Sequence, residues 1–146
     1  MDYMELLKNY YLFSGVASSD LQAVEKIAER KTYIAGDSVY SEGDVADALF
    51  LIEVGTVDIV PRRKEMVFAT IGSGQGFGEL AFFEPGARPA SASVRERTSL
   101  LRIPYDRLSK VIAERPGFAL LVYRNACAFF AKHFRTMGLN LNRRYL

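Results

Sequence analysis

The feature that most constrains the fold is a series of short apolar segments through the middle of the chain, separated by glycines and turns. These segments are residues 49–54, 56–60, 66–71, 91–97 and 99–103. Gly55 separates the first two, and Gly36 and Gly43 punctuate two earlier runs. Runs of this length are typical of β-strands and too short for most helices. No strand–helix–strand alternation interrupts them, so the pattern favours a closed antiparallel barrel over a Rossmann-like sheet.

Helical patterns flank this region on both sides. Residues 3–11 and 19–30 have apolar residues at helical spacing, and Ser19–Gln22 has the form of a capping box. After the strands, residues 106–114 form a further amphipathic pattern, and Pro116 begins a last, long helix. We therefore predict one mainly β domain over residues 1–146: N-terminal helices in 1–30, an antiparallel β-roll of jelly-roll (double-stranded β-helix) type in 31–104, and C-terminal helices in 105–146.

Composition sets the broad class of the protein. Hydrophobic residues make up 49% of the chain and charged residues 25%, as in globular domains, and a net charge of +2 is too small to indicate nucleic acid. Cys127 is the only cysteine, which favours a reducing compartment, and we expect it to be a buried small apolar residue. With no signal-peptide pattern and no apolar run that could span a bilayer, we expect a cytoplasmic protein without membrane contact.

The last helix has two apolar stripes where one would suffice. The first stripe consists of Phe118, Leu121, Val122 and Phe129, and the second of Phe130, Phe134, Met137 and Leu141. A helix packed on one barrel needs a single stripe about 100° wide. The second stripe predicts a homodimer in which this helix packs against a second copy. The alternative is that the helix is more deeply buried in its own fold.

The candidate site lies in a glycine-rich turn at residues 72–78, followed by Glu79. The turn matches neither the dinucleotide motif G-x-G-x-x-G nor a P-loop, because it has no third glycine at the required place and no Gly-Lys-Ser/Thr. Glycines allow the backbone to approach an anion, which successive N–H groups can hold. A neighbouring carboxylate could accept hydrogen bonds from a sugar hydroxyl. The alternative interpretation is an ordinary turn between two strands.

Residues 77–81, Phe-Gly-Glu-Leu-Ala, and residues 89–94, Pro-Ala-Ser-Ala-Ser-Val, resemble the phosphate-binding cassette of cyclic-nucleotide-binding domains. That family includes the catabolite activator proteins, the regulatory subunits of cyclic-AMP-dependent kinase and the cyclic-nucleotide-gated channels. Residues 12–15, Gly36, 42–44, 49–52 and Gly55 follow the family's order upstream. The resemblance covers essentially the whole chain.

The resemblance implies a role for each part of the cassette. Glu79 would bind the ribose 2′-hydroxyl, the backbone of residues 78–81 would hold the cyclic phosphate, and an arginine would pair with that phosphate. Two registers compete for the arginine. Matching the last residues of the motif puts Ala90 in its place and is the closer likeness, whereas counting forward from Glu79 gives Arg88 in an Arg-x-Ala-Ser pattern ending at Ser91.

The candidate ligand-binding residues are Phe77, Gly78, Glu79, Leu80, Ala81, Arg88, Ala90 and Ser91. We expect a regulatory domain that binds cyclic AMP or cyclic GMP, needs no cofactor, and signals through an unknown protein partner or self-association. Because the chain ends at Leu146 without a helix-turn-helix, no direct DNA recognition is expected. The alternative function is a degenerate dimerisation or interaction module that has lost the phosphate arginine.

Neither of these two functions is enzymatic, and we expect no catalytic activity, since the sequence offers no nucleophile–base pair and no metal-binding cluster. His133 is the only histidine, so a multi-histidine metal site cannot be built. In the family the C-terminal helix helps to cover the base. Asn125, Lys132 and His133 are therefore the candidates for contact with the purine, and the sequence does not choose among them.

Overall fold

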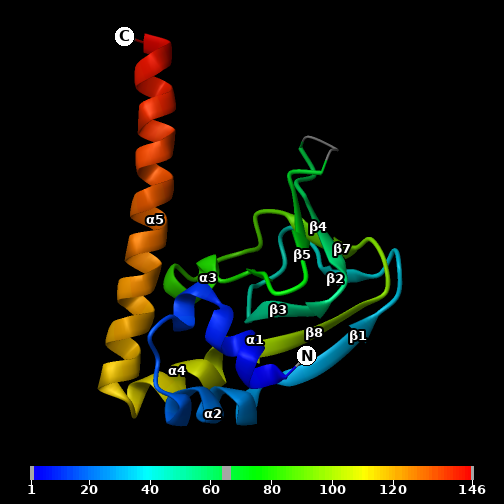
Figure 1. Cartoon of the computed structure of the whole chain (residues 1–146). Coiled ribbons are helices and arrows are strands. Elements are labelled where there is room, and N and C mark those ends of the chain that lie inside the picture. The colour runs from blue at the N-terminus through cyan, green and yellow to red at the C-terminus, as the bar shows by residue number, and fades with distance from the viewer. Residues whose placement is uncertain (1, 64–66, 146) are drawn as a thin grey trace.

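The computed structural model describes residues 2–63 and 67–145, with side chains as far as Gly138. Two four-stranded antiparallel sheets, of order β1-β8-β3-β6 and β2-β7-β4-β5, face each other as a roll, and helices cover one side of it (Figure 1). The strands are β1 Glu29–Tyr33, β2 Ser38–Tyr40, β3 Ala48–Val54, β4 Thr56–Val60, β5 Ala69–Gly72, β6 Gly76–Phe77, β7 Ser91–Val94 and β8 Thr98–Pro104. The predicted β-roll with flanking helices is confirmed.

The helices lie at both ends of the chain and at one point within the roll. They are α1 Tyr3–Asn9, the 3₁₀ helix η1 Tyr11–Phe13, α2 Ser18–Ile27, α3 Leu80–Phe83, α4 Tyr105–Ala113 and α5 Pro116–Tyr145. The helices α1, α2 and α4 gather at one end of the roll, and α5 rises along its side and projects beyond it (Figure 1). Within the described residues, no helix is both long and apolar enough to cross a membrane.

Strand β3 is apolar almost without alternation because both of its faces are covered. Ala48, Phe50 and Ile52 lie in the core between the two sheets. Leu49 and Leu51 point the other way, into the core formed with the helices. Each set follows the two-residue period of a strand, and each meets apolar neighbours. The roll is therefore held between two hydrophobic cores, with β3 and β8 shared by both.

The boundary between the N-terminal helices and the roll differs from the prediction. Helix α2 ends at Ile27, and β1 already pairs with β8 from Glu29, opposite Arg102. The predicted capping box at Ser19 is wrong: Ala17 is the N-cap and makes no side-chain cap hydrogen bond. The carbonyl of Ala17 accepts from the N–H groups of residues 20 and 21, so Ser19 is already helical. Part of the predicted strand 66–71 lies outside the described residues, and β5 begins at Ala69.

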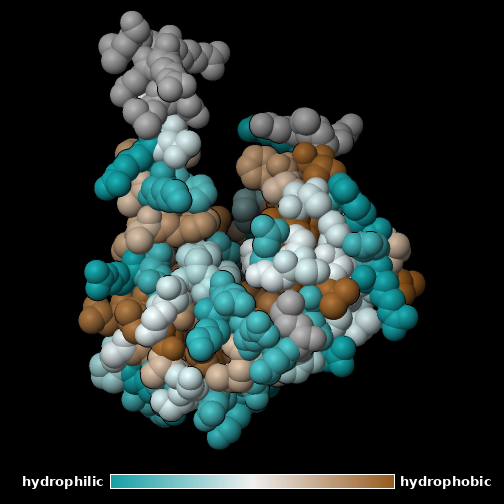
Figure 2. Space-filling view, in the orientation of Figure 1, coloured by the Kyte–Doolittle hydropathy of each residue, from teal (hydrophilic) through white to brown (hydrophobic). Residues whose placement is uncertain are grey.

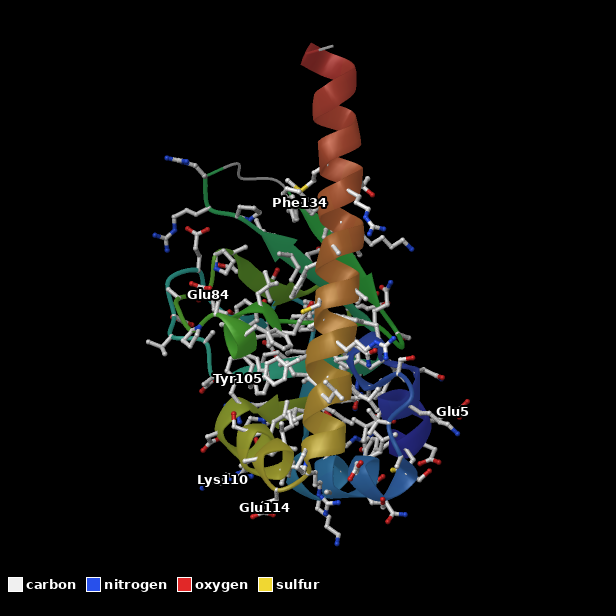
Figure 3. All side chains as sticks on the ribbon, turned by 90° about the vertical axis from the view of Figure 1, so that its left-hand side faces the viewer. Glu5, Glu84, Tyr105, Lys110, Glu114 and Phe134 are labelled. Atoms are coloured by element: carbon white, nitrogen blue, oxygen red, sulfur yellow. The ribbon has the colours of Figure 1, made fainter. Side chains whose placement is uncertain are left out.

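Helix α5 has one buried stripe and one exposed stripe. Phe118 and Val122 are 1% and 0% exposed, whereas Phe134 and Met137 are 75% and 62% exposed. Figure 2 shows apolar side chains on α5 where it rises above the roll, and Figure 3 shows Phe134 projecting from the helix there. The side chain of Leu141 lies outside the described residues. Phe130, the first member of the second predicted stripe, is partly buried against the helical core, whereas Phe134 and Met137 are uncovered in the single chain.

The prediction of a buried Cys127 is wrong, because this thiol is exposed. Its neighbour Ala126 faces the core and is 2% exposed. Successive residues of an α-helix differ by about 100° around its axis, so the position after a buried one turns away from the core.

Candidate functional site

The site is built where β6 ends and the short helix α3 begins. Gly78 joins the two with a φ of +80°, a conformation that glycine adopts without strain. Glu79 follows as the N-cap of α3. The N–H groups in the first turn of a helix have no intrahelical acceptor, so they are available for an anion or for water. A Cβ at Gly78 would lie 2.9 Å from Nη1 of Arg88, so glycine also leaves room for this arginine.

Arg88 reaches this turn from the loop between α3 and β7 and is only 4% exposed. Its Nη1 donates to the carbonyl of Gly78 at 3.0 Å, and its Nη2 donates to the carbonyl of Ala48 at 2.6 Å. The guanidinium carbon lies 4.1 Å from the centre of the Tyr40 ring, a cation–π distance. Among the residues that the structure describes, no carboxylate lies within ion-pair distance of Arg88.

The missing ion pair matters because a buried cation is costly without a counter-charge. The carbonyls of Gly78 and Ala48 and the ring of Tyr40 offset part of this cost, but they are neutral groups and supply no negative charge. Arg88 therefore places a positive charge, with no direct carboxylate contact among the described residues, beside a glycine turn, an arrangement suited to an anion.

Glu79 lies on the same turn, and its carboxylate is largely removed from water. The hydroxyl of Tyr11 donates to Oε1 of Glu79 at 3.1 Å. Burial raises the pKa of Glu79, while hydrogen bonds from its own backbone N–H and from Tyr11, together with the charge of Arg88, act in the opposite direction. The site thus holds an acidic acceptor and a basic donor on two sides of Gly78.

Two partly buried tyrosines, Tyr40 and Tyr105, lie beside these charged residues. Tyr105, at the start of α4 and between α3 and α4, donates its hydroxyl to the carbonyl of Gly78 (Figure 3). Nη1 of Arg88 lies 3.4 Å from the same hydroxyl. Burial raises the pKa of Tyr105, and it raises that of Tyr40 to about 12, so both hydroxyls stay protonated. Neither tyrosine is predicted from the sequence, because neither stands in a motif or at a distinctive spacing.

The structure brings Gly78, Glu79 and Arg88 together but gives other candidate residues different surroundings. Phe77 stacks on Phe50 in the core between the sheets, with ring centres 5.2 Å apart. Ala90 is 8% exposed and offers no charged group. The hydroxyl of Ser91 accepts from the backbone N–H of residue 42 at 2.9 Å. Of the two residues considered for the phosphate arginine, the one whose side chain contacts the turn is Arg88.

Two hollows flank the cassette, which we define as residues 77–91. One, of about 420 Å³, reaches Arg88 alongside Tyr40 and Phe50. The other is a mainly apolar groove of about 520 Å³ between α3 and α5. Its lining residues are Leu80, Ala81, Phe83, Glu84, Ala87, Pro89 and Phe130. The candidate residues Leu80 and Ala81 thus face this groove, and Leu80 is 56% exposed.

The three residues considered for the purine lie on α5. Asn125 donates its side-chain amide to the carbonyls of Leu12 and Ser14, both at 2.9 Å, and so ties η1 to α5. Lys132 and His133 are exposed, and Nδ1 of His133 lies 2.9 Å from the carbonyl of Phe129 on the same helix. Within the part of the chain that the structure describes, no three histidine, cysteine, aspartate or glutamate side chains gather at metal-binding distances.

The fold and the glycine turn with its buried arginine define a nucleotide-binding type of β-roll, and comparison with known proteins agrees. The family model described as "Cyclic nucleotide-binding domain" matches residues 30–115. The chain belongs to the cyclic nucleotide-binding domain family. The match includes all of the candidate ligand-binding residues between 77 and 91, whereas the purine candidates Asn125, Lys132 and His133 lie beyond it.

Individual relatives come from bacteria and from eukaryotes. The chain is 32% identical to the CRP-like cAMP-activated global transcriptional regulator of Mycobacterium tuberculosis, over 94% of this chain and 61% of that protein. It is 30% identical to the cAMP-dependent protein kinase regulatory subunit of Schizosaccharomyces pombe, over 86% of this chain and 29% of that protein. The crystal structure of the Thermus thermophilus Catabolite Activator Protein superposes with a TM-score of 0.75 at 29% identity, covering 90% of this chain and 62% of the other.

The chain therefore spans about three-fifths of the length of its transcription-regulator relative and a smaller share of the kinase subunit. What these matches share with the chain is the β-roll and its adjoining helices.

Proposed function

We propose that this chain is a regulatory domain that binds a 3′,5′-cyclic nucleotide, cyclic AMP or cyclic GMP, at the cassette. The observation that carries the proposal is Arg88: a buried guanidinium, without a described carboxylate partner, held beside the positive-φ turn at Gly78. A cyclic phosphate is a singly charged anion and supplies the counter-charge that this arginine lacks.

The other groups of the site have roles that fit the same ligand. The carboxylate of Glu79 would accept a hydrogen bond from the ribose 2′-hydroxyl, and backbone N–H groups of residues 78–81 would hold phosphate oxygens. The apolar groove between α3 and α5 supports placing the purine there. Ligand that contacts both the roll and α5 would bias their relative position, because it stabilises whichever arrangement it binds more tightly.

The position of Arg88 also bears on the alternative of a degenerate interaction module. That alternative requires the phosphate arginine to be lost, as it would be if Ala90 occupied its place. Arg88, two residues before Ala90 in the chain, instead contacts the carbonyl of Gly78. This geometry supports a functional binding site over a degenerate one.

A homodimer through α5 would give such a domain an output. Phe134 and Met137 leave a stripe of large apolar side chains in water, which a second copy of the helix would cover. The regulatory relatives support a regulatory role for this domain.

The test is a displacement titration with a fluorescent cyclic nucleotide on the wild type, Arg88→Met and Arg95→Met. Arg95 is a matched control because it is an exposed arginine, paired with Asp58 at 2.9 Å away from the cassette. Losing one charge-assisted contact to phosphate costs about 1.5–3 kcal/mol, so Arg88→Met should bind roughly tenfold to 150-fold more weakly. Wild-type affinity in Arg95→Met is expected. Equal affinity in Arg88→Met and the wild type would refute the assignment.

A further inference from the structure

We infer that Tyr11 is a positioning residue that holds the Glu79 carboxylate for the ribose and fixes it relative to α5. This inference rests on the proposed function and adds to it a residue outside the cassette. Tyr11 lies in η1, and its hydroxyl donates to Oε1 of Glu79 at 3.1 Å, across 68 positions of sequence.

The other face of Tyr11 is fixed by α5. Its ring stacks on Phe129, with ring centres 4.1 Å apart and planes 19° apart. The Asn125 amide of the same helix donates to the carbonyl of Leu12, within η1, and to that of Ser14, which directly follows η1. A side chain held by a stack and a backbone clamp loses little further freedom when its hydroxyl donates, so this hydrogen bond is preorganised.

Tyr11 therefore joins two parts of the molecule that a ligand would contact. A movement of α5 relative to η1 would disturb the stacking of Tyr11 on Phe129. The position of the Tyr11 hydroxyl relative to Glu79 would change with it. Because that hydroxyl donates to a carboxylate, it favours the ionised form, which is the better acceptor for a sugar hydroxyl.

Several charged and titratable groups lie near the Glu79 carboxylate, and Tyr11 differs from the others in donating a hydrogen bond to it. The charged and titratable groups that face Glu79 from the elements around it are Tyr10, Tyr11, Tyr40, Arg88 and Tyr105. The neighbouring hydroxyl of Tyr10 is buried and lies close to that of Tyr11. Tyr11 is thus the only side chain among those described that donates a hydrogen bond to the Glu79 carboxylate.

The test compares Tyr11→Phe, which keeps the stack and removes the hydroxyl, with the control Tyr3→Phe. Tyr3 lies on α1 against the helical core, and its hydroxyl makes no hydrogen bond to any residue that the structure describes. Two quantities are measured on each protein: the affinity for cyclic AMP and cyclic GMP as a function of pH, and the ionisation of the Glu79 carboxyl without nucleotide, by carbon NMR.

We expect Tyr11→Phe to bind nucleotide about tenfold more weakly near neutral pH, the loss of one hydrogen bond to a charged group. The pH below which binding fails should move upward, together with the ionisation of Glu79, whereas Tyr3→Phe should match the wild type in both measurements. Asn125→Ala, which removes the clamp on η1 and leaves the cassette unchanged, should move both quantities in the same direction.

The outcomes separate this inference from the proposed function. If the wild type binds and Tyr11→Phe binds equally well with an unchanged pH profile, the positioning role is refuted and the proposed function stands. Tighter binding by Tyr11→Phe also overturns the inference, because Tyr11 would then compete with the ribose. If the wild type binds neither nucleotide, the proposed function fails, and the positioning role fails with it.

Discussion

Replacing Gly78 with alanine should separate ligand binding from folding, because the structure assigns this position two distinct costs. The first is backbone strain, since φ is +80° and an L-residue in the left-handed region costs about 1–2 kcal/mol. The second is a collision: the new Cβ would lie 2.9 Å from Nη1 of Arg88. The guanidinium is the far end of a flexible side chain, so it would move away rather than unfold the turn.

Gly36 supplies a control in which only the first cost operates. Its φ is +91°, and a Cβ there would have no heavy atom within 4 Å. Gly36→Ala should therefore lose about 1–2 kcal/mol of unfolding free energy and melt roughly 2–8 °C lower. Gly78→Ala should lose at least as much, because moving Arg88 also disturbs its hydrogen bonds to the carbonyls of Gly78 and Ala48. Only Gly78→Ala should also displace Arg88, and it should bind cyclic nucleotide roughly tenfold to 150-fold more weakly.

Calorimetric titration with nucleotide and thermal unfolding on both variants measure the two effects separately. Equal affinities for Gly78→Ala and Gly36→Ala would refute the reasoning, because they would mean that the place of Arg88 beside Gly78 does not matter for the ligand. A far larger loss of stability in Gly78→Ala than in Gly36→Ala would show that the buried guanidinium of Arg88 cannot move aside.

Two further predictions concern Glu79 and α5. The pKa of Glu79 is raised in the folded state, so ionising it opposes folding, and this penalty grows as the pH rises above the ordinary carboxyl range. Glu79→Gln should therefore melt at a higher temperature than the wild type at about pH 7, and this difference should vanish at about pH 4. The variant should also bind nucleotide less well. Equal melting temperatures of variant and wild type at both pH values would contradict this. Phe134→Glu places a charge on the exposed stripe and should yield folded monomers in sedimentation equilibrium, with a melting temperature that no longer depends on protein concentration. A dimer that persists would exclude this stripe from the interface.

The strand pattern was sufficient to predict the roll because its physical cause is local. Short apolar runs broken by Gly36, Gly43 and Gly55 correspond to turns in which all three glycines have positive φ. The two stripes of α5 were likewise visible in sequence, and the first stripe is buried at Phe118 and Val122. Where the prediction failed, the local signal was ambiguous: the hydroxyl at Ser19 suggested a cap, yet the helix begins one residue earlier.

The site was less predictable because its contacts join distant parts of the chain. Sequence likeness favoured Ala90 for the phosphate arginine, whereas in the structure the loop between α3 and β7 carries Arg88 to Gly78. The length of this loop does not predict which groups the long, flexible side chain of Arg88 contacts. Tyr11 and Tyr105 reach the turn from opposite ends of the sequence, and only the packed fold places their hydroxyls there.

The most direct test of the central claim is a calorimetric titration of the wild-type chain with cyclic AMP and cyclic GMP, with the linear nucleotide 5′-AMP as the control. The account predicts saturable binding of at least one cyclic nucleotide at one site per chain, and weaker binding of 5′-AMP, whose phosphate carries more charge and lacks the ring. No binding of either cyclic nucleotide by a folded chain would contradict the account.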